Sequence, residues 1–265
     1  MKKTVLPVLL LCSIISCTNN DSTPGDTPNN IPQTPAISYS VANTLPHDTS
    51  YFLEGLEFYK GNLLESTGLE GKSRLIEYDP GTGKVSKQVQ LDSVYFGEGL
   101  TVFKDTIYQM TYKEGVVHVY SAKDFKKIKQ LPYTNGEGWG LTHDSTHLIG
   151  TNSGNSLYYY EPGTFKLVKS VGITENGVPA VNLNELEYIN GFIYANQWQY
   201  NTILKIDPVK GEVVAKMDLT SIVKQENAQN PAAEYLNGIA YNPVTKKFYI
   251  TGKYWSKIYE LRFDL

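Results

Sequence analysis

The pattern of apolar and polar residues after residue 36 is a series of short alternating runs separated by turn sequences. Residues 75–85 and 203–213 each contain two such runs joined by Asp-Pro-x-x-Gly, and residues 157–164 contain a related run that ends in Glu-Pro-Gly-Thr. Proline presets φ for a turn and glycine readily adopts positive φ, so these sequences are typical of β-hairpins. We therefore predict a chain of short strands joined by tight turns.

A triplet with a fixed frame recurs along these strands. Its five copies are Glu54-Gly55-Leu56, Glu98-Gly99-Leu100, Trp139-Gly140-Leu141, Asn184-Glu185-Leu186 and Asn237-Gly238-Ile239. The third residues lie 44, 41, 45 and 53 positions apart, and each copy opens a unit of short strands. Such repeats are typical of four-stranded propeller blades, whereas the turns of a β-sandwich would not recur at a fixed long period. We predict an all-β, five-bladed β-propeller; the alternative is two β-domains with chance similarity.

The two ends of the repeat region complement each other. The last unit, residues 237–265, has room for only three strands, while residues 37–45 read as an isolated strand near the start of the chain. If this N-terminal strand is added to the last blade as its outer strand, the ring closes and no sheet edge is left exposed. We therefore assign residues 37–265 to one propeller domain.

The N-terminus has the features of an exported lipoprotein. Residues 1–16 carry two lysines before an apolar segment that is too short to span a bilayer, as in a signal peptide. The segment ends in Ile-Ile-Ser-Cys, which resembles a bacterial lipobox, so we expect Cys17 to be lipid-modified; an ordinary signal peptide is the alternative. Residues 17–36 are mostly polar and are expected to form a disordered tether. The predicted location is the cell envelope, and the absence of Asp after Cys17 favours the outer membrane.

Charge and composition exclude several classes of function. The 24 Lys and Arg residues against 27 Asp and Glu provide no basic surface for nucleic acid, and membrane contact is expected only through the lipid anchor. Both cysteines lie within the first seventeen residues, so the body of the protein has no disulfide or thiol chemistry. His143 and His147 flank Asp-Ser-Thr, which is typical of a hairpin turn, so no metal site is expected there.

The triplets also indicate where a ligand would bind. The inner strand of each propeller blade borders a central channel, so the five triplets should meet at one mouth of that channel. Their first residues are Glu, Glu, Trp, Asn and Asn, whereas a purely structural repeat would tend to keep one residue type. This variation points to a ligand site; for each polar residue the alternative is that it satisfies the backbone of a turn.

Seven stretches in chain order resemble the glutamine cyclotransferase family, the plant and bacterial glutaminyl cyclases. They are 65–69 (ESTGL), 95–101 (YFGEGLT), 138–141 (GWGL), 183–191 (LNELEYING), 195–199 (ANQWQ), 236–240 (LNGIA) and 251–253 (TGK). The resemblance implies a five-bladed propeller that converts the N-terminal glutamine of peptides or proteins into pyroglutamate and releases ammonia. It also implies an enzyme without a catalytic metal or cofactor, which we expect to be a monomer.

The resemblance also assigns roles to individual positions. Glu98, in Phe-Gly-Glu-Gly, matches the family's catalytic acid, and Asn184 and Lys253 match polar residues of its substrate pocket. The positions assigned to substrate binding are Phe52, Glu54, Phe96, Tyr112, Trp139 and Trp198. Two of these depart from the family pattern, since Glu54 stands where Phe-Thr-Gln-Gly has an amide and Tyr112 stands where tryptophan is common. A second carboxylate at Glu54 could raise the pKa of Glu98 or bind the substrate amine.

The chemistry of ring closure supports these roles. The α-amine of glutamine attacks its own side-chain amide, so a single carboxyl group between aromatic walls can relay a proton from the amine to the leaving nitrogen. We expect Glu98 to be this group, with Asn184 and Lys253 as donors to the developing oxyanion. The alternatives are a non-catalytic propeller that binds peptides or a protein partner, and cyclisation of N-terminal glutamate with loss of water.

Overall fold

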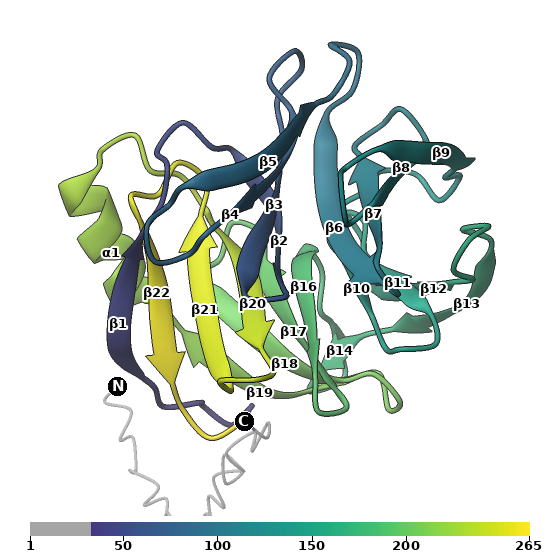
Figure 1. The fold of residues 1–265 in the computed structure, drawn as a ribbon. Coiled ribbons are helices and arrows are strands. Elements are labelled where there is room, and N and C mark those ends of the chain that lie inside the picture. The colour runs from purple at the N-terminus through teal and green to yellow at the C-terminus, as the bar shows by residue number, and fades with distance from the viewer. Residues whose placement is uncertain (1–32) are drawn as a thin grey trace, which may run out of the picture. The chain divides into compact units, whose positions relative to one another are not determined.

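The computed structural model describes residues 33–265; the expected signal peptide 1–16, Cys17 and the rest of the segment before Gln33 lie outside the described residues. The described chain forms five sheets around one axis (Figure 1). The innermost strands contact each other in the cyclic order β2 (Leu53–Tyr59), β6 (Gly97–Phe103), β10 (Leu141–His143), β16 (Leu183–Ile189), β20 (Leu236–Asn242) and back to β2. The five-bladed propeller predicted from the repeat is confirmed.

The first four blades add their four main strands outward from the axis in chain order. The first blade contains β2, β3 (Asn62–Thr67), β4 (Arg74–Tyr78) and β5 (Val85–Gln90), and the second contains β6, β7 (Thr106–Thr111), β8 (Val116–Ser121) and β9 (Lys127–Pro132). The third contains β10, β11 (Leu148–Gly150), β12 (Ser156–Tyr160) and β13 (Leu167–Gly172). The fourth contains β16, β17 (Phe192–Gln197), β18 (Thr202–Asp207) and β19 (Glu212–Asp218), with the short strands β14 (Thr174–Glu175) and β15 (Val178–Pro179) at its outer edge. The predicted hairpin turns lie between β4 and β5 and between β18 and β19.

The fifth blade combines the two ends of the described chain. Its strands are β20, β21 (Lys247–Gly252), β22 (Lys257–Arg262) and, antiparallel to β22, the N-terminal strand β1 (Ser40–Pro46). Just before β1, Ala36 forms a parallel bridge to Lys216 of β19, with Ile37 N–H donating to the Lys216 carbonyl at 2.8 Å. The packed body therefore begins before the predicted boundary at residue 37, and the N-terminal segment contacts both the fourth and the fifth blades.

Apolar clusters hold neighbouring blades together. The buried third residues of the triplets are Leu56, Leu100, Leu141, Leu186 and Ile239, and each belongs to the cluster between its own blade and the preceding one. Burial of such a side chain contributes about 1.5–3 kcal/mol. The apolar third position of the repeat is therefore explained by packing between blades.

The middle residue of the triplet sits where two inner strands approach most closely. A Cβ atom on Gly140 would lie 1.9 Å from the carbonyl oxygen of Asn184, so only glycine fits there. In the fourth blade Glu185 takes this position. Its buried carboxylate accepts hydrogen bonds from the backbone N–H of Leu56 (3.2 Å) and of Ile239 (2.7 Å). One side chain thus joins the fourth blade to the first and the fifth.

The helix α1 (Thr220–Gln229) follows β19 and accounts for the longest spacing between triplets, from the fourth blade to the fifth. It buries Ile222, Val223 and Glu226. Glu226 accepts hydrogen bonds from Ser256 N–H and from the Tyr259 hydroxyl, so the helix is tied to the fifth blade. Within residues 33–265, no helix has the length and apolar character needed to cross a membrane.

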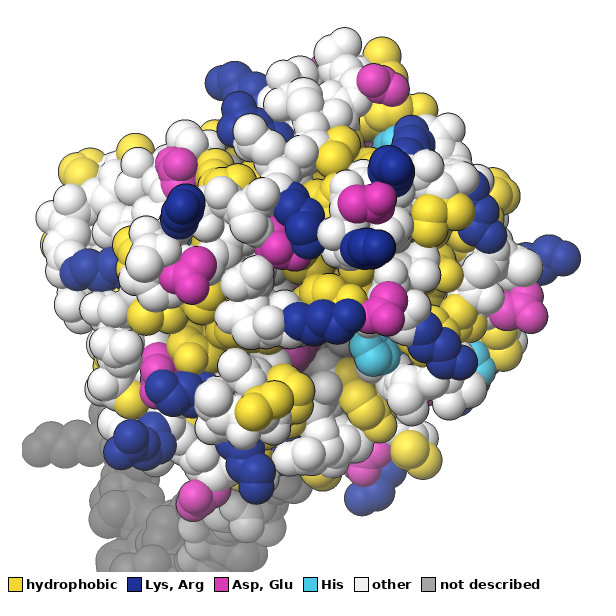
Figure 2. Space-filling model, in the orientation of Figure 1, with side chains coloured by type: hydrophobic (Ala, Val, Ile, Leu, Met, Phe, Trp, Pro, Cys, Tyr) yellow, Lys and Arg dark blue, Asp and Glu magenta, His cyan; other side chains and the backbone are white. Residues whose placement is uncertain are grey.

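Charged side chains of both signs are interspersed over the face shown in Figure 2, with apolar side chains visible between them. This distribution agrees with the nearly balanced counts of acidic and basic residues in the sequence. Some apolar side chains on the outer strands are exposed, such as Ile128 and Val168. Exposure of this kind is usual for folded proteins.

Candidate active site

A pocket of about 230 Å³ opens at the mouth of the channel where the inner strands begin. Its lining consists of Phe52, Glu54, Phe96, Glu98, Tyr112, Trp139, Asn184, Trp198, Tyr235 and Lys253. The structure therefore brings together all nine pocket residues that the sequence analysis singled out, from all five blades. Tyr235 is the one lining residue that the sequence analysis missed.

The first residues of four triplets line the pocket, namely Glu54, Glu98, Trp139 and Asn184, whereas Asn237 donates a hydrogen bond to Glu54. The register between the inner strand and its neighbour shifts at this point in four blades, around Glu54, Glu98, Asn184 and Asn237. A β-bulge of this type bends the strand and turns a side chain away from its regular direction. In the four triplets whose first residues line the pocket, a buried apolar residue between blades thus lies two positions after a residue of the pocket.

Aromatic rings form the walls of the site. One row runs through Tyr254, Phe52, Phe96 and Tyr112, with successive ring centroids 5.3, 6.1 and 5.6 Å apart. The other row runs through Trp139, Trp198 and Tyr235, with successive centroids 5.6 and 6.0 Å apart. These walls provide an apolar surface for the methylene groups of a ligand and limit the access of water.

An ion pair between the first and fifth blades occupies one side of the pocket. The ammonium of Lys253 lies 2.6 Å from Glu54 Oε1 and 4.2 Å from the centroid of the Phe52 ring. The other oxygen of Glu54 accepts a hydrogen bond from Asn237 Nδ2 at 3.2 Å. Both oxygens of Glu54 are therefore engaged by the protein.

Glu98 is the carboxyl group in this pocket without such partners: within residues 33–265 its side chain forms no hydrogen bond or ion pair, and it is 5% exposed. Burial raises the pKa of Glu98 well above its ordinary value, the Glu54 carboxylate raises it further, and Lys253 opposes these effects. Glu98 therefore holds a proton at pH values where an exposed glutamate would be ionised. The Glu54 carboxylate, a departure from the family pattern, favours this protonated state.

Asn184 of the fourth blade lines the pocket. Its Oδ1 is buried and has no hydrogen-bond partner within the part of the chain that the structure describes. An unpaired buried polar atom costs about 1–3 kcal/mol, and a ligand that donates a hydrogen bond removes this cost. The donor role that the sequence analysis expected for Asn184 stays a prediction.

The loop that carries Lys253 is held by hydrogen bonds on both sides. The backbone N–H of Lys253 donates to the Tyr235 carbonyl (3.0 Å), and the Lys253 carbonyl accepts from Glu234 N–H (2.9 Å). Asn230 Nδ2 donates to the carbonyl of Tyr254 at 2.6 Å. The position of the ammonium is thus determined by the segment that follows α1, which also contributes Tyr235 to the pocket wall.

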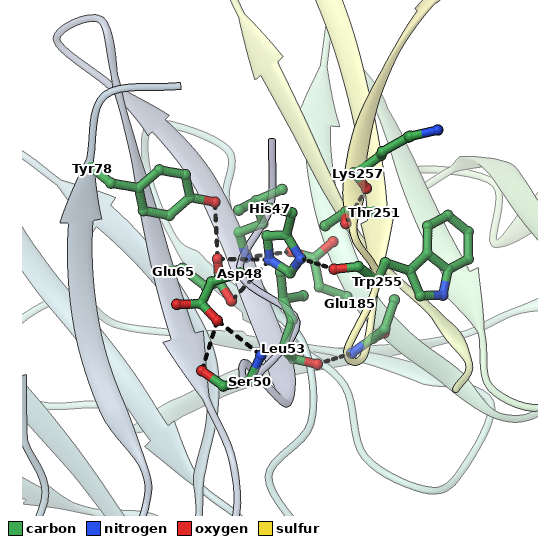
Figure 3. Close-up of polar contacts among 12 residues, drawn as sticks. His47, Asp48, Ser50, Leu53, Glu65, Tyr78, Glu185, Thr251, Trp255 and Lys257 are labelled. Atoms are coloured by element: carbon green, nitrogen blue, oxygen red, sulfur yellow. Dashed lines mark hydrogen bonds and ion pairs between the residues drawn. The ribbon is translucent and has the colours of Figure 1, made fainter. Parts of the chain in front are cut away.

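A buried cluster around His47 contacts the Trp255 carbonyl, two residues after Lys253 (Figure 3). His47 Nδ1 lies 2.8 Å from the Trp255 carbonyl, and Nε2 lies 3.2 and 3.3 Å from the Glu65 carboxylate, which also accepts a hydrogen bond from the Tyr78 hydroxyl. Both ring nitrogens face oxygen acceptors, and both are satisfied when His47 is an imidazolium. Burial acts against this charge, but the Glu65 carboxylate and the Trp255 carbonyl outweigh it and raise the pKa of His47.

A second cavity, of about 430 Å³, lies around the opposite ends of the inner strands and includes Glu57 and Glu187. Each accepts a backbone hydrogen bond from the next blade, Glu57 from Val102 and Glu187 from Tyr241, both at 3.0 Å. Burial raises the pKa of Glu57 to about 7. These carboxyl groups therefore join adjacent blades at a distance from the pocket that holds Glu98.

Histidine and carboxylate side chains are not grouped as metal ligands. Among residues 33–265, no three His, Cys, Asp or Glu side chains are placed to hold a metal ion. His143 ends β10 and pairs with Leu148 of β11, so residues 143–148 form the hairpin that the sequence predicted. In its turn, His147 Nδ1 lies 3.5 Å from Asp144 Oδ2.

The profile of the glutamine cyclotransferase family matches residues 8–263. The chain belongs to this family. It is 35% identical to a glutaminyl-peptide cyclotransferase of Arabidopsis thaliana over 225 residues, which are 84% of this chain and 70% of the plant protein. The crystal structure of Myxococcus xanthus glutaminyl cyclase matches it with a TM-score of 0.81 and 33% identity, over 88% of this chain and 99% of that one.

In this glutamine cyclotransferase, the missed residue Tyr235 has a sequence signal after all. It stands two positions before the triplet of the fifth blade, as Phe52 and Phe96 do in the first and second blades. All three aromatic side chains line the pocket. An aromatic residue two positions before the triplet therefore belongs to the motif in the first, second and fifth blades, while Glu137 and Asn182 take this position in the third and fourth. His47 has no comparable signal, because its partners lie far away in the sequence.

Proposed function

We propose that this glutamine cyclotransferase is a glutaminyl-peptide cyclotransferase, which converts N-terminal glutamine to pyroglutamate and releases ammonia. The observation that carries this proposal is the buried, proton-holding carboxyl of Glu98 in a pocket walled by aromatic rings. The Glu54–Lys253 pair and the free oxygen of Asn184 border the same space. The names of the plant and bacterial relatives support the same reaction.

The reaction forms one bond and breaks one bond within the substrate. The α-amine nitrogen attacks the side-chain amide carbon, and the bond from that carbon to the amide nitrogen breaks as ammonia leaves. The pocket has to fold the glutamine into a near-attack shape, which replaces a costly search through conformations. The aromatic walls hold the methylene groups, and Asn184 Oδ1 accepts a hydrogen bond from the α-amine.

Glu98 moves the proton that this rearrangement requires. In its protonated form it donates to the departing amide nitrogen, and the proton lost by the attacking amine returns to its carboxylate. The net result is a transfer of one proton from the amine to ammonia, with Glu98 regenerated. Lys253 donates to the oxygen that becomes negative in the tetrahedral intermediate, while Glu54 balances its charge in the resting site.

A direct assay tests the proposed reaction. We expect the protein to release one ammonia for each Gln-initiated peptide, and the product to have the mass of the peptide minus ammonia. The same peptide with an acetylated α-amine should not react, because its nitrogen is a poor nucleophile. Absence of ammonia from the free peptide would favour the non-catalytic, peptide-binding alternative, and loss of water from a Glu-initiated peptide would indicate the other cyclisation.

The variant Glu54→Gln tests the electrostatic coupling in the pocket. The Glu54 carboxylate raises the pKa of Glu98, and a Lys253 ammonium without its partner lowers it, so we expect this pKa to fall. Activity that needs protonated Glu98 is lost as pH rises through its pKa. The alkaline limb of the pH profile of kcat/KM, where Glu98 loses its proton, should therefore move to lower pH. The limb set by ionisation of the substrate's α-amine should stay in place, because the substrate is the same. Superimposable profiles for the two proteins would contradict the coupling.

A further inference from the structure

Three large apolar side chains are exposed beside one wall of the pocket. Val181, Tyr200 and Tyr235 are 43%, 52% and 43% exposed, and they lie in loops at the end of the propeller where the triplets begin. Val181 precedes β16, Tyr200 lies between β17 and β18, and Tyr235 precedes β20. Together with Trp198 they form a surface that we name the apolar ledge.

Hydrogen bonds hold the segments that carry Val181, Trp198 and Tyr200 in place relative to one another. Trp198 N–H donates to the Asn182 carbonyl at 2.8 Å, and Gln197 Nε2 donates to the Val181 carbonyl at 3.0 Å. Tyr200 N–H donates to the Gln197 carbonyl at 3.0 Å. The turn that carries Trp198 and Tyr200 is therefore fastened to the loop that carries Val181.

The apolar ledge is continuous with the pocket. Trp198 and Tyr235 line the pocket, and their rings are in edge-to-face contact with centroids 6.0 Å apart. The rim beyond Tyr112 has a different character, since Lys113 and Glu137 form an ion pair there at 3.3 Å. The mouth of the pocket thus has an apolar side and a charged side.

We propose that the apolar ledge binds the apolar side chain of the second residue of the peptide substrate. The inference rests on the proposed function, in which the pocket holds the N-terminal glutamine. The carbonyl group of that glutamine is bonded to the next residue, so the peptide has to leave through the mouth. A leucine or phenylalanine in this position removes exposed apolar surface from water on both molecules. A charged side chain gains no partner among the four ledge residues and loses part of its hydration.

The test compares two peptides that differ only in the second residue, Gln-Leu-Ala-amide and Gln-Gly-Ala-amide. We expect kcat/KM of the wild type to be about tenfold higher for the leucine peptide, because partial burial of a leucine side chain is worth about that factor. In Tyr200→Ser the ratio between the peptides should fall to a few-fold. The matched control is Val94→Ser, a similarly exposed apolar residue (66%) in the loop before β6, which should keep the wild-type ratio.

The possible results separate this inference from the proposed function. If both peptides release ammonia with equal kcat/KM, or if Tyr200→Ser keeps the wild-type ratio, the subsite is wrong and the cyclotransferase activity stands. The same result is expected if the apolar ledge serves contact with another protein. If neither peptide releases ammonia, the proposed function fails and the inference fails with it.

Discussion

Replacing Glu98 by glutamine is expected to lower kcat by about 10²–10⁴-fold, the range for loss of a general acid or base. The amide has nearly the shape of the protonated carboxyl but cannot pass a proton from the attacking amine to the leaving nitrogen. KM should change much less, because the aromatic walls and Asn184 are retained. Steady-state release of ammonia from a Gln-initiated peptide measures both constants.

Glu187→Gln is the matched control for this experiment. Glu187 is also buried in an inner strand, and burial together with the nearby Glu57 and Glu185 raises its pKa well above the ordinary value, but it lines the cavity at the other end of the strands. This variant should keep the wild-type kcat. Wild-type turnover in Glu98→Gln would show that Glu98 is not the proton shuttle.

The variant Lys253→Met should affect both stability and catalysis. It removes the partner of a buried carboxylate, and breaking a buried ion pair in this way typically costs about 3–5 kcal/mol. It also removes a donor to the oxyanion, which is expected to lower kcat by about 10²–10³-fold. Urea unfolding measures the first effect and ammonia release the second. The loss of stability should be smaller at acidic pH, because a protonated Glu54 no longer needs a cation.

The double variant Glu54→Gln/Lys253→Met separates these two roles. It leaves no unpaired charge in the pocket, and the new amide can still accept a hydrogen bond from Asn237. We expect it to regain most of the stability lost in Lys253→Met without regaining turnover. If the double variant recovers wild-type kcat, then Lys253 is only a counter-ion for Glu54 and does not take part in the reaction.

The propeller could be predicted from sequence because its repeat has local physical causes. The third residue of each triplet packs between blades, as Leu100 does, and the middle residue is glycine where a side chain would collide with the next strand, as at Gly140. The apolar requirement recurs at every blade and the glycine at four of the five, which leaves a visible period. The pocket followed from the same repeat, because the first residues of four of the five triplets line it.

Other features could not be read from one sequence, because they depend on contacts between distant residues. The pairing of His47 with Glu65 and Trp255 joins the segment after β1 to the first and fifth blades. Glu185 resembles any polar residue of an inner strand until its contacts with Leu56 and Ile239 are seen. The helix α1 lies in the longest interval between triplets, but it buries only three side chains and has a weak apolar pattern. The lipid anchor at Cys17 stays a prediction from sequence.

The pairing of β1 with β22 has a consequence for the order in which the protein can fold. Ser40 is paired with Arg262, so β1 has no partner until the chain has been synthesised as far as β22. Until then β1 is an unpaired strand, and before residue 255 is made the Trp255 carbonyl that holds His47 is absent. Contacts between such distant segments form slowly, because a long loop has to close before they contribute. Completion of the ring therefore follows synthesis of the fifth blade and requires both ends of the domain.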